Sequence, residues 1–323
     1  MRTQKVDAYN SRPTSGVSNE YPTPAASFKQ PALHIIQGVR NSGKSYLASQ
    51  ILEQAHRDKT FDVVYIITPS FLSNKAYFGK YIREEDVFEP TRGSVEAVIQ
   101  RVEADRDEWE AFLQQQKQYE QYRRKIHSND LLGDHELLAY WQHGFLQGSE
   151  PKWKYGKPQA PRSLLILDDV LGSPAILQSS GLTRIATLNR HIAPLKEAHS
   201  GRSACGLGCM ILTQTYRMQS GLGRALRENV SLLTVFKNKQ EKQLDVIRDE
   251  LASVVDVELF NKAYEYATKE RFGNLTVDFA PKKPEFQFRK NLNEFIINVW
   301  PKYNAAARQP HTAASQGPVD VVP

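Results

Sequence analysis

The sequence has little cysteine and no long apolar run. Two cysteines in 323 residues, Cys205 and Cys209, cannot form a disulfide framework, and a chain of this length buries enough surface to fold without one. No segment approaches the roughly 20 apolar residues of a membrane-spanning helix, and the first residues are too polar for a signal peptide. We therefore expect a soluble, intracellular protein with no membrane partner and with both thiols reduced.

The sequence also lacks an internal repeat, a strongly basic arm and, in its C-terminal third, the acidic cluster typical of a nuclease. The 42 Lys and Arg residues exceed the 36 Asp and Glu residues, which gives a net charge of +6. This excess permits a polyanionic partner such as nucleic acid, but it is too small to require one.

Proline and polar residues mark both ends of the chain. Eight of the 17 prolines lie in 13–31 and 301–323, among Ser, Thr, Ala and Gln without apolar periodicity. Such segments bury too little surface to order themselves. The sequence therefore predicts flexible tails at 1–31 and 301–323 around one folded domain at 32–300.

Short, nearly continuous apolar runs predict buried strands inside this domain. The runs are Ala32–Gln37, Val63–Thr68, Leu164–Leu167, Cys209–Thr213 and Leu232–Phe236, with a further short strand at Leu275–Phe279. Helical patterns separate the runs, and residues 243–268 form one of them. This alternation predicts an α/β fold with a mainly parallel central sheet flanked by helices.

A helical insertion at about 94–160 interrupts the alternation. From Ser94 to about Ile126 the sequence has no Pro or Gly, and apolar residues recur every three or four positions, which predicts one long helix. Its length of roughly 45–50 Å exceeds what a crossover needs. Two interpretations stay open: the helix projects as an arm or packs along a neighbouring molecule, or it lies on its own domain.

The first predicted strand is followed by the complete pattern GxxxxGK[ST]. Its residues are Gly38, Val39, Arg40, Asn41, Ser42, Gly43, Lys44 and Ser45, and we expect these residues and the following Tyr46 to bind the nucleotide. In this strand–loop–helix setting, backbone N–H groups and the helix N-terminus bind phosphate oxygens. We expect Lys44 to reach the β- and γ-phosphates and Ser45 to ligate Mg²⁺. The sequence therefore predicts a P-loop NTPase.

The acidic part of the site is expected at the end of the strand Leu164–Leu167. Asp168 is the expected magnesium-side carboxylate, and Asp169 is the expected general base for the attacking water. Gln214 directly follows the strand Cys209–Thr213. At the carboxyl edge of the sheet it would orient the water or sense the γ-phosphate.

A GTPase switch is one alternative. Residues 169–172 match DxxG, and residues 238–241 approach NKxD but end in a glutamate of the wrong length. The chain between Lys44 and Asp169 is also far longer than the single crossover that joins these elements in a small GTPase. A non-hydrolysing, nucleotide-binding assembly scaffold is another alternative, against which the intact lysine and acidic residues argue.

The order of five segments carries a family resemblance. The segments are GVRNSGKS, LLILDD, LNRH, ILTQTYR and LRENVSLLTVFKNK. Over about residues 32–240 the chain resembles the genome-packaging ATPases of large eukaryotic DNA viruses and virophages, the poxvirus-type branch of the FtsK–HerA superfamily. The resemblance implies a RecA/ASCE-like ATPase that forms a homo-oligomeric ring and uses ATP and Mg²⁺. It would translocate double-stranded DNA, without sequence preference, into a preformed capsid at the site of virion assembly, with a capsid or portal protein as partner.

Ring ATPases insert a positive charge at the γ-phosphate, often from a neighbouring subunit. The resemblance places Arg190 and Arg227 at positions that the family keeps. Arg217 and Arg224 are further candidates, and Arg40 could act within its own subunit.

The basic segment before Cys209 suggests a DNA contact. Lys196, His199 and Arg202 are the candidates for lining a central pore, where they would contact the phosphates of the DNA backbone. The candidates for a zinc site nearby are Cys205, Cys209, His191 and His199. We favour a core role for Cys209 instead, because it begins a predicted buried strand.

Overall fold

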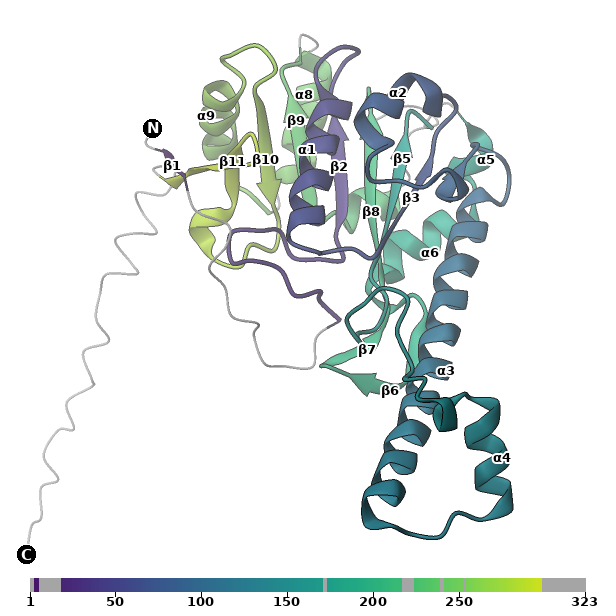
Figure 1. Cartoon of the computed structure of the whole chain (residues 1–323). Coiled ribbons are helices and arrows are strands. Elements are labelled where there is room, and N and C mark those ends of the chain that lie inside the picture. Colours follow the sequence, from purple (N-terminus) through teal and green to yellow (C-terminus); the bar gives the residue numbers. More distant parts are fainter. Residues whose placement is uncertain are drawn as a thin grey trace, which may run out of the picture.

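A ten-stranded sheet forms the centre of the computed structural model, which describes residues 3–5, 19–170, 173–216, 224–238, 241–252 and 254–297 (Figure 1). The strand order is β1-β12-β11-β10-β9-β2-β8-β5-β3-β4. The strands are β1 Thr3–Lys5, β2 Leu33–Gln37, β3 Val63–Ile67, β4 Val87–Phe88, β5 Ser163–Asp168, β8 Leu207–Thr213, β9 Leu232–Phe236, β10 Asn274–Asp278, β11 Phe288–Lys290 and β12 Glu294–Ile296. The strands from β9 to β4 are parallel, and the remaining four pair antiparallel.

Helices cover both faces of this sheet. The helices in the described ranges are α1 Lys44–Arg57, α2 Phe71–Phe78, α3 Ser94–Ser128, α4 Asp134–Gln142, α5 Pro174–Leu177, α6 Ser180–Leu188, α7 Arg224–Glu228, α8 Glu241–Leu251 and α9 Val257–Ala267. Residues of α1 and α2 pack with one face of the strands, and residues of α3, α6, α8 and α9 pack with the other. The predicted α/β fold with a mainly parallel sheet flanked by helices is confirmed.

The central strands explain the nearly continuous apolar runs in the sequence. In β2, Ile35 packs into the cluster on the α3 face, whereas Ile36 packs into the cluster on the α1 face. Leu165 and Ile166 of β5 divide in the same way. Because both faces are covered, most positions carry an apolar side chain, and each one that is fully buried contributes roughly 1.5–3 kcal/mol.

Residues 19–31, which the sequence analysis assigns to a tail, pack against the domain. The side chain of Tyr21 is only 3 % exposed, and its hydroxyl donates a 3.0 Å hydrogen bond to the carbonyl of Gly206. It also accepts a hydrogen bond from the N–H of Ser163, which begins β5. Phe28 is buried as well. A few single aromatic side chains therefore anchor a segment that has no periodic pattern.

The long helix α3 both lies on the domain and projects from it, so each interpretation holds for one half (Figure 1). Its first half contributes Val95, Val98 and Val102 to the core. Its second half runs away from the sheet and returns through α4 and the short 3₁₀ helix Phe145–Gln147. Edge-on and tilted contacts among the rings of Tyr119, Tyr122, Tyr140 and Phe145 hold this arm together.

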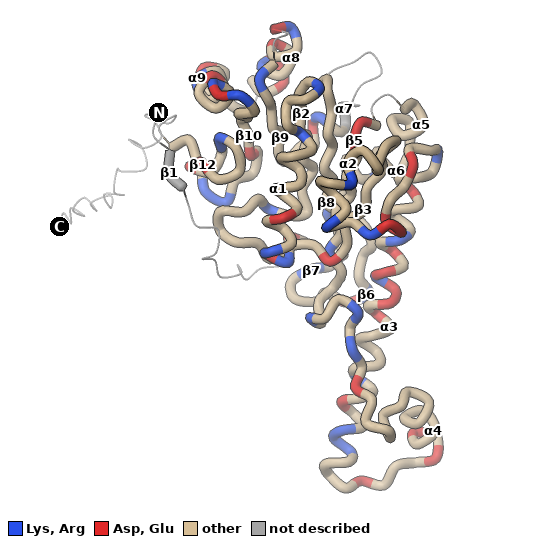
Figure 2. The backbone as a smooth tube through the Cα atoms, turned by 45° about the horizontal axis from the view of Figure 1, so that its top comes forward, with Lys and Arg blue, Asp and Glu red and all other residues tan. Residues whose placement is uncertain are grey.

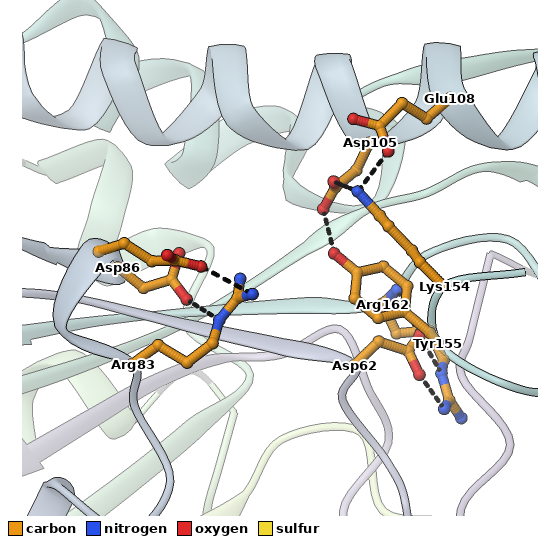
Figure 3. A network of polar contacts seen from close by, with 9 residues as sticks. Asp62, Arg83, Asp86, Asp105, Glu108, Lys154, Tyr155 and Arg162 are labelled. Atoms are coloured by element: carbon orange, nitrogen blue, oxygen red, sulfur yellow. Dashed lines mark hydrogen bonds and ion pairs between the residues drawn. The ribbon is translucent and has the colours of Figure 1, made fainter.

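Ion pairs fasten α3 to the chain that returns toward β5 (Figure 3). Lys154 bridges Asp105 and Glu108 of α3, with both nitrogen–oxygen distances at 2.6 Å, and Tyr155 donates to Asp105 at 2.9 Å. The buried pair of Arg162 and Asp62 then joins the start of β5 to the start of β3. Each pair is also hydrogen-bonded, which offsets the cost of removing its charges from water.

The segment 194–204 forms a hairpin of β6 Pro194–His199 and β7 Arg202–Ala204 that packs along α3. The prediction that Arg202 lines a pore is wrong, because this side chain is 4 % exposed and donates to the carbonyls of Ala160, Pro161 and Cys205. The His199 ring lies 5.2 Å from that of Trp109 on α3. Lys196 is exposed and pairs with Glu110.

None of the helices in the described ranges has both the length and the apolar character needed to cross a bilayer.

A buried histidine makes the stability of this fold sensitive to acid. His34 of β2 hydrogen-bonds Thr234 at 2.8 Å, and burial, together with the charge of Arg289, lowers its pKa to about 3. Between pH 6.5 and that value the unfolded chain binds the proton and the folded chain does not, so stability falls as the pH falls. We expect the wild type to lose on the order of 1 kcal/mol more unfolding free energy than His34→Gln between pH 7.5 and 5.5.

Chemical denaturation at both pH values measures this difference. Comparing the pH dependence rather than absolute stability removes any constant cost of the substitution. Equal losses in the two proteins would contradict the assignment to His34.

Candidate functional site

The loop between β2 and α1 is held at the carboxyl edge of the sheet. The N–H of Gly38 donates to the carbonyl of Thr213 at 3.0 Å, which continues the ladder between β2 and β8. Gly43 adopts a φ of 104°, a conformation that side chains disfavour, and its carbonyl accepts the first helical bond of α1 from Leu47. The backbone therefore curls around the helix N-terminus, as a phosphate-binding loop requires.

The interior of this loop has no room for another carbon atom. A Cβ at Gly38 would collide with the Ser42 hydroxyl and would lie 3.0 Å from Cβ of Phe236. The Ser42 hydroxyl is buried and has no hydrogen-bond partner among the described residues. A buried hydroxyl of this kind calls for an acceptor, and a phosphate oxygen in the loop supplies one.

Lys44 lies at the centre of the site. Its Nζ donates to the carbonyls of Gly38 at 2.6 Å and Val39 at 3.1 Å. Burial lowers the pKa of this ammonium, whereas the carboxylates of Asp169 and Asp168 act in the opposite direction. A triphosphate bound in the loop would present stronger acceptors to the same ammonium.

Asp168 ends β5 with a side chain that is 5 % exposed. Its Oδ2 accepts from Asn74 of α2 at 2.7 Å and from Thr68 at 3.3 Å. Burial raises the pKa of this carboxyl. Hydroxyl and carboxylate oxygens from Ser45 and Asp168 form the hard donor set that Mg²⁺ prefers, so the residues present fit the metal.

Gln214 and Asp169 meet at the edge between the loop and β5. The Nε2 of Gln214 donates to Oδ1 of Asp169 at 3.2 Å. Asp169 has a φ of 54°, which is uncommon outside glycine. Its N–H still bonds to the carbonyl of Leu212 in β8 at 3.4 Å, so Asp169 lies at the last position of the ladder. The buried Gln37, at the end of β2, donates to the backbone carbonyl of Gln214 at 3.2 Å. The structure thus places the predicted residues Lys44, Asp168, Asp169 and Gln214 along one sheet edge.

Sequence reasoning missed Gln37, Thr68 and Asn74. Thr68 directly follows β3, and a polar residue in that place was the only available signal for it. Gln37 carries the same kind of signal, because it is a polar residue at the end of β2, whereas Asn74 had no signal in the sequence pattern.

A cavity of about 910 Å³ adjoins the loop. Its walls include the loop and the start of α1 from Asn41 to Leu47, and Asn74 and Tyr77 of α2. On its other side lie the segments 270–274 and 291–294, next to β10 and β11. The cavity is therefore large enough for a ligand that extends well beyond the phosphates.

Of the candidate arginines, Arg190 and Arg227 are not part of this cluster within one chain. Arg190 is exposed in the 3₁₀ helix Asn189–His191, next to the start of β8 and so at the opposite sheet edge. Arg227 of α7 pairs with Glu250 at 2.8 Å. Arg40 is exposed on the loop itself. The Arg217 and Arg224 side chains lie outside the described residues.

The zinc interpretation has no support in the described ranges, where no group of three or more His, Cys, Asp or Glu side chains is placed to hold a metal. Both thiols are buried. Burial raises the pKa values of Cys205 and Cys209 to about 12, which is typical of core cysteines.

No family model and no curated protein matches the sequence. The genome-packaging NTPase B204 of Sulfolobus turreted icosahedral virus 2, in complex with ATPγS, is 14 % identical, with a TM-score of 0.39 over 81 % of this chain and 97 % of that one. B204 of Sulfolobus turreted icosahedral virus, a DNA-packaging ATPase, is 12 % identical, with a TM-score of 0.41 over the same shares. The pCW3 conjugation coupling protein TcpA is 15 % identical, with a TM-score of 0.35 over 70 % and 56 %. At these sequence identities and TM-scores, the similarity to the solved structures does not by itself assign an activity to this chain.

The crowded loop gives a direct test of phosphate binding. Because an added methyl group forces Ser42 or Phe236 to move, we expect Gly38→Ala to weaken binding of magnesium triphosphate by at least roughly tenfold, equivalent to about 1.4 kcal/mol. Calorimetric titration measures the affinity.

Gly133→Ala is the matched control. Gly133 has a φ of −73°, and the nearest atom to an added Cβ lies 3.9 Å away, so this variant should bind as the wild type does. Unchanged binding by Gly38→Ala would show that the phosphates bind elsewhere.

Proposed function

We propose that the protein hydrolyses nucleoside triphosphates in a magnesium-dependent reaction, with ATP as the substrate. The observation that carries this proposal is the convergence of the phosphate loop, Asp168, Asp169 and Gln214 at one sheet edge. The alternation of strands and helices produces this edge, and the residue types match the needs of phosphoryl transfer to water.

Each side chain has a defined task in this reaction. The loop N–H groups and Lys44 hold the phosphates and stabilise the charge that develops on them. Ser45 and Asp168 would hold Mg²⁺, which neutralises charge on the phosphate oxygens when it is bound. Asp169 accepts the proton of the attacking water. Gln214, fixed by its bond to Asp169, orients that water.

We further propose that hydrolysis drives the translocation of double-stranded DNA, as in genome packaging into a capsid. The ordered set of motifs between 32 and 240 supports this step, because it includes segments that the phosphate chemistry alone does not need. Arg190 supports a ring: its exposed position at the far sheet edge suits a charge delivered to a neighbouring subunit. Both positively and negatively charged residues lie along α3 (Figure 2). The arm is therefore not a continuous basic surface of the kind that binds DNA.

The GTPase alternative gains little from the fold. Strand β8 lies between β2 and β5, so the phosphate loop and the DxxG segment are not on neighbouring strands. Leu171, Gly172, Lys239 and Gln240 of the two GTPase patterns lie outside the described residues.

Steady-state hydrolysis tests the proposal. We expect turnover of ATP that rises when double-stranded DNA is added, and a loss of at least roughly 100-fold in Lys44→Ala, because the loop then lacks its central charge. A preference for GTP without a response to DNA would instead support a switch, and the absence of turnover would support a scaffold.

A mixing experiment tests the role of Arg190. Arg190→Ala and Lys44→Ala should each be inactive alone. If Arg190 acts on the neighbouring subunit, co-expressed rings of both variants regain turnover at about one interface in four, where an intact loop faces an intact arginine. Inactive mixed rings, with both variants still assembled, would assign Arg190 to another task.

A further inference from the structure

Phe272 occupies an unusual position beside the phosphate loop. An added Cβ at Gly43 would lie 3.6 Å from the Phe272 ring, so the ring rests against the loop. The side chain is nevertheless 53 % exposed and forms part of the cavity wall. Its φ of 65° places a bulky residue in a backbone region that such residues rarely adopt, and residues of this kind cluster at ligand sites.

The sheet topology places Phe272 on the opposite side of the phosphate loop from the carboxylates. Strand β10 begins at Asn274, which pairs with Phe236 at the carboxyl end of β9. The turn before β10 therefore lies at the same sheet edge as the phosphate loop. β9 and β10 flank β2 on one side, whereas β8 and β5, with Asp168, flank it on the other.

We propose that Phe272 is the stacking platform for the base of the bound nucleoside triphosphate. The proposal rests on the proposed function: with the γ-phosphate near Lys44 and the carboxylates, the sugar and base extend into the cavity toward the β10 side. There the exposed ring offers the flat apolar surface that a base needs.

Arg271 adds to this platform. Its guanidinium lies 4.7 Å from the centroid of the Phe272 ring, so the pair presents both an aromatic surface and a cation. Behind it, a Cβ at Gly273 would collide with the carbonyl of Ala267, so the backbone of the turn packs closely against the end of α9.

Two tyrosines in the same cavity are weaker candidates. Tyr77 lies on α2, one turn from Asn74, which bonds Asp168, and so is on the carboxylate side. Tyr46 projects from the first turn of α1, directly after Ser45, and its hydroxyl accepts a hydrogen bond from Gln50. Neither belongs to the β10 side of the cavity. Tyr46 is therefore the alternative aromatic residue to test beside Phe272.

Stacking contributes affinity but little selectivity, because every base has a flat face. Its loss lowers affinity by roughly 5- to 150-fold per base. Phe272→Ala should therefore bind ATP and GTP more weakly by similar factors. Its affinity for magnesium tripolyphosphate, which has no base, should be unchanged.

The experiment titrates the three ligands into the full-length wild type, Phe272→Ala, Phe272→Trp and Tyr46→Ala. Phe272→Trp should restore ATP affinity, because its ring also stacks. Selective loss of ATP and GTP affinity in Phe272→Ala, with tripolyphosphate binding intact, is the expected result.

Three results would overturn the proposal. An equal loss for all three ligands would assign Phe272 a structural role in the loop. Unchanged ATP binding by Phe272→Ala, or a selective loss in Tyr46→Ala instead, would place the base elsewhere. In each of these cases, a wild type that still hydrolyses ATP leaves the proposed function standing. A wild type that binds neither ATP nor tripolyphosphate would instead contradict both the proposed function and the role of Phe272.

Discussion

The site depends on the parallel hydrogen-bond ladder that joins β2, β8 and β5. Gln37 pairs with Thr213, and Asp168 pairs with Leu212, so all three strands end at nearly the same level. The ladder continues beyond the strands, because the N–H groups of Gly38 and Asp169 still bond to carbonyls of β8. The ladder therefore holds the phosphate loop after β2 and the turn after β5, which are unrelated in sequence, on either side of the end of β8. A slip in register would separate the phosphate loop from the carboxylates and remove the chemistry.

The long insertion is attached to this frame without entering the site. The inner half of α3 belongs to the main core, whereas Trp109, Phe112 and Trp153 form a cluster of their own where the helix leaves the sheet. The hairpin β6–β7 packs there as well. Motion of the outer half of α3 and of α4 thus leaves the ladder intact. In a ring of subunits this separation would allow the arm to contact a neighbour while the phosphate loop keeps its shape.

The local sequence pattern predicted those parts of the fold and of the site whose residues lie close together in the sequence. The phosphate loop, the strand before Asp168 and the helix from Ser94 belong to this group, because spacing and burial act over a few residues. Contacts between distant segments had no such signal. Asn74 reaches Asp168 only because α2 packs beside β5 in the fold, and Arg202 is buried because backbone carbonyls surround it. A basic, glycine-containing segment looks the same in sequence whether its charge is buried or exposed.

The central claim is that Gln214 and the carboxylates form one hydrolytic site with the phosphate loop. Single-turnover hydrolysis and equilibrium ATP binding by Gln214→Ala test it most directly. Because Gln214 contacts Asp169 and is absent from the wall of the cavity proposed to bind the nucleotide, ATP binding should stay within about twofold of the wild type while the rate of the chemical step falls by roughly 10²-fold or more. An unchanged rate in the variant would contradict the account.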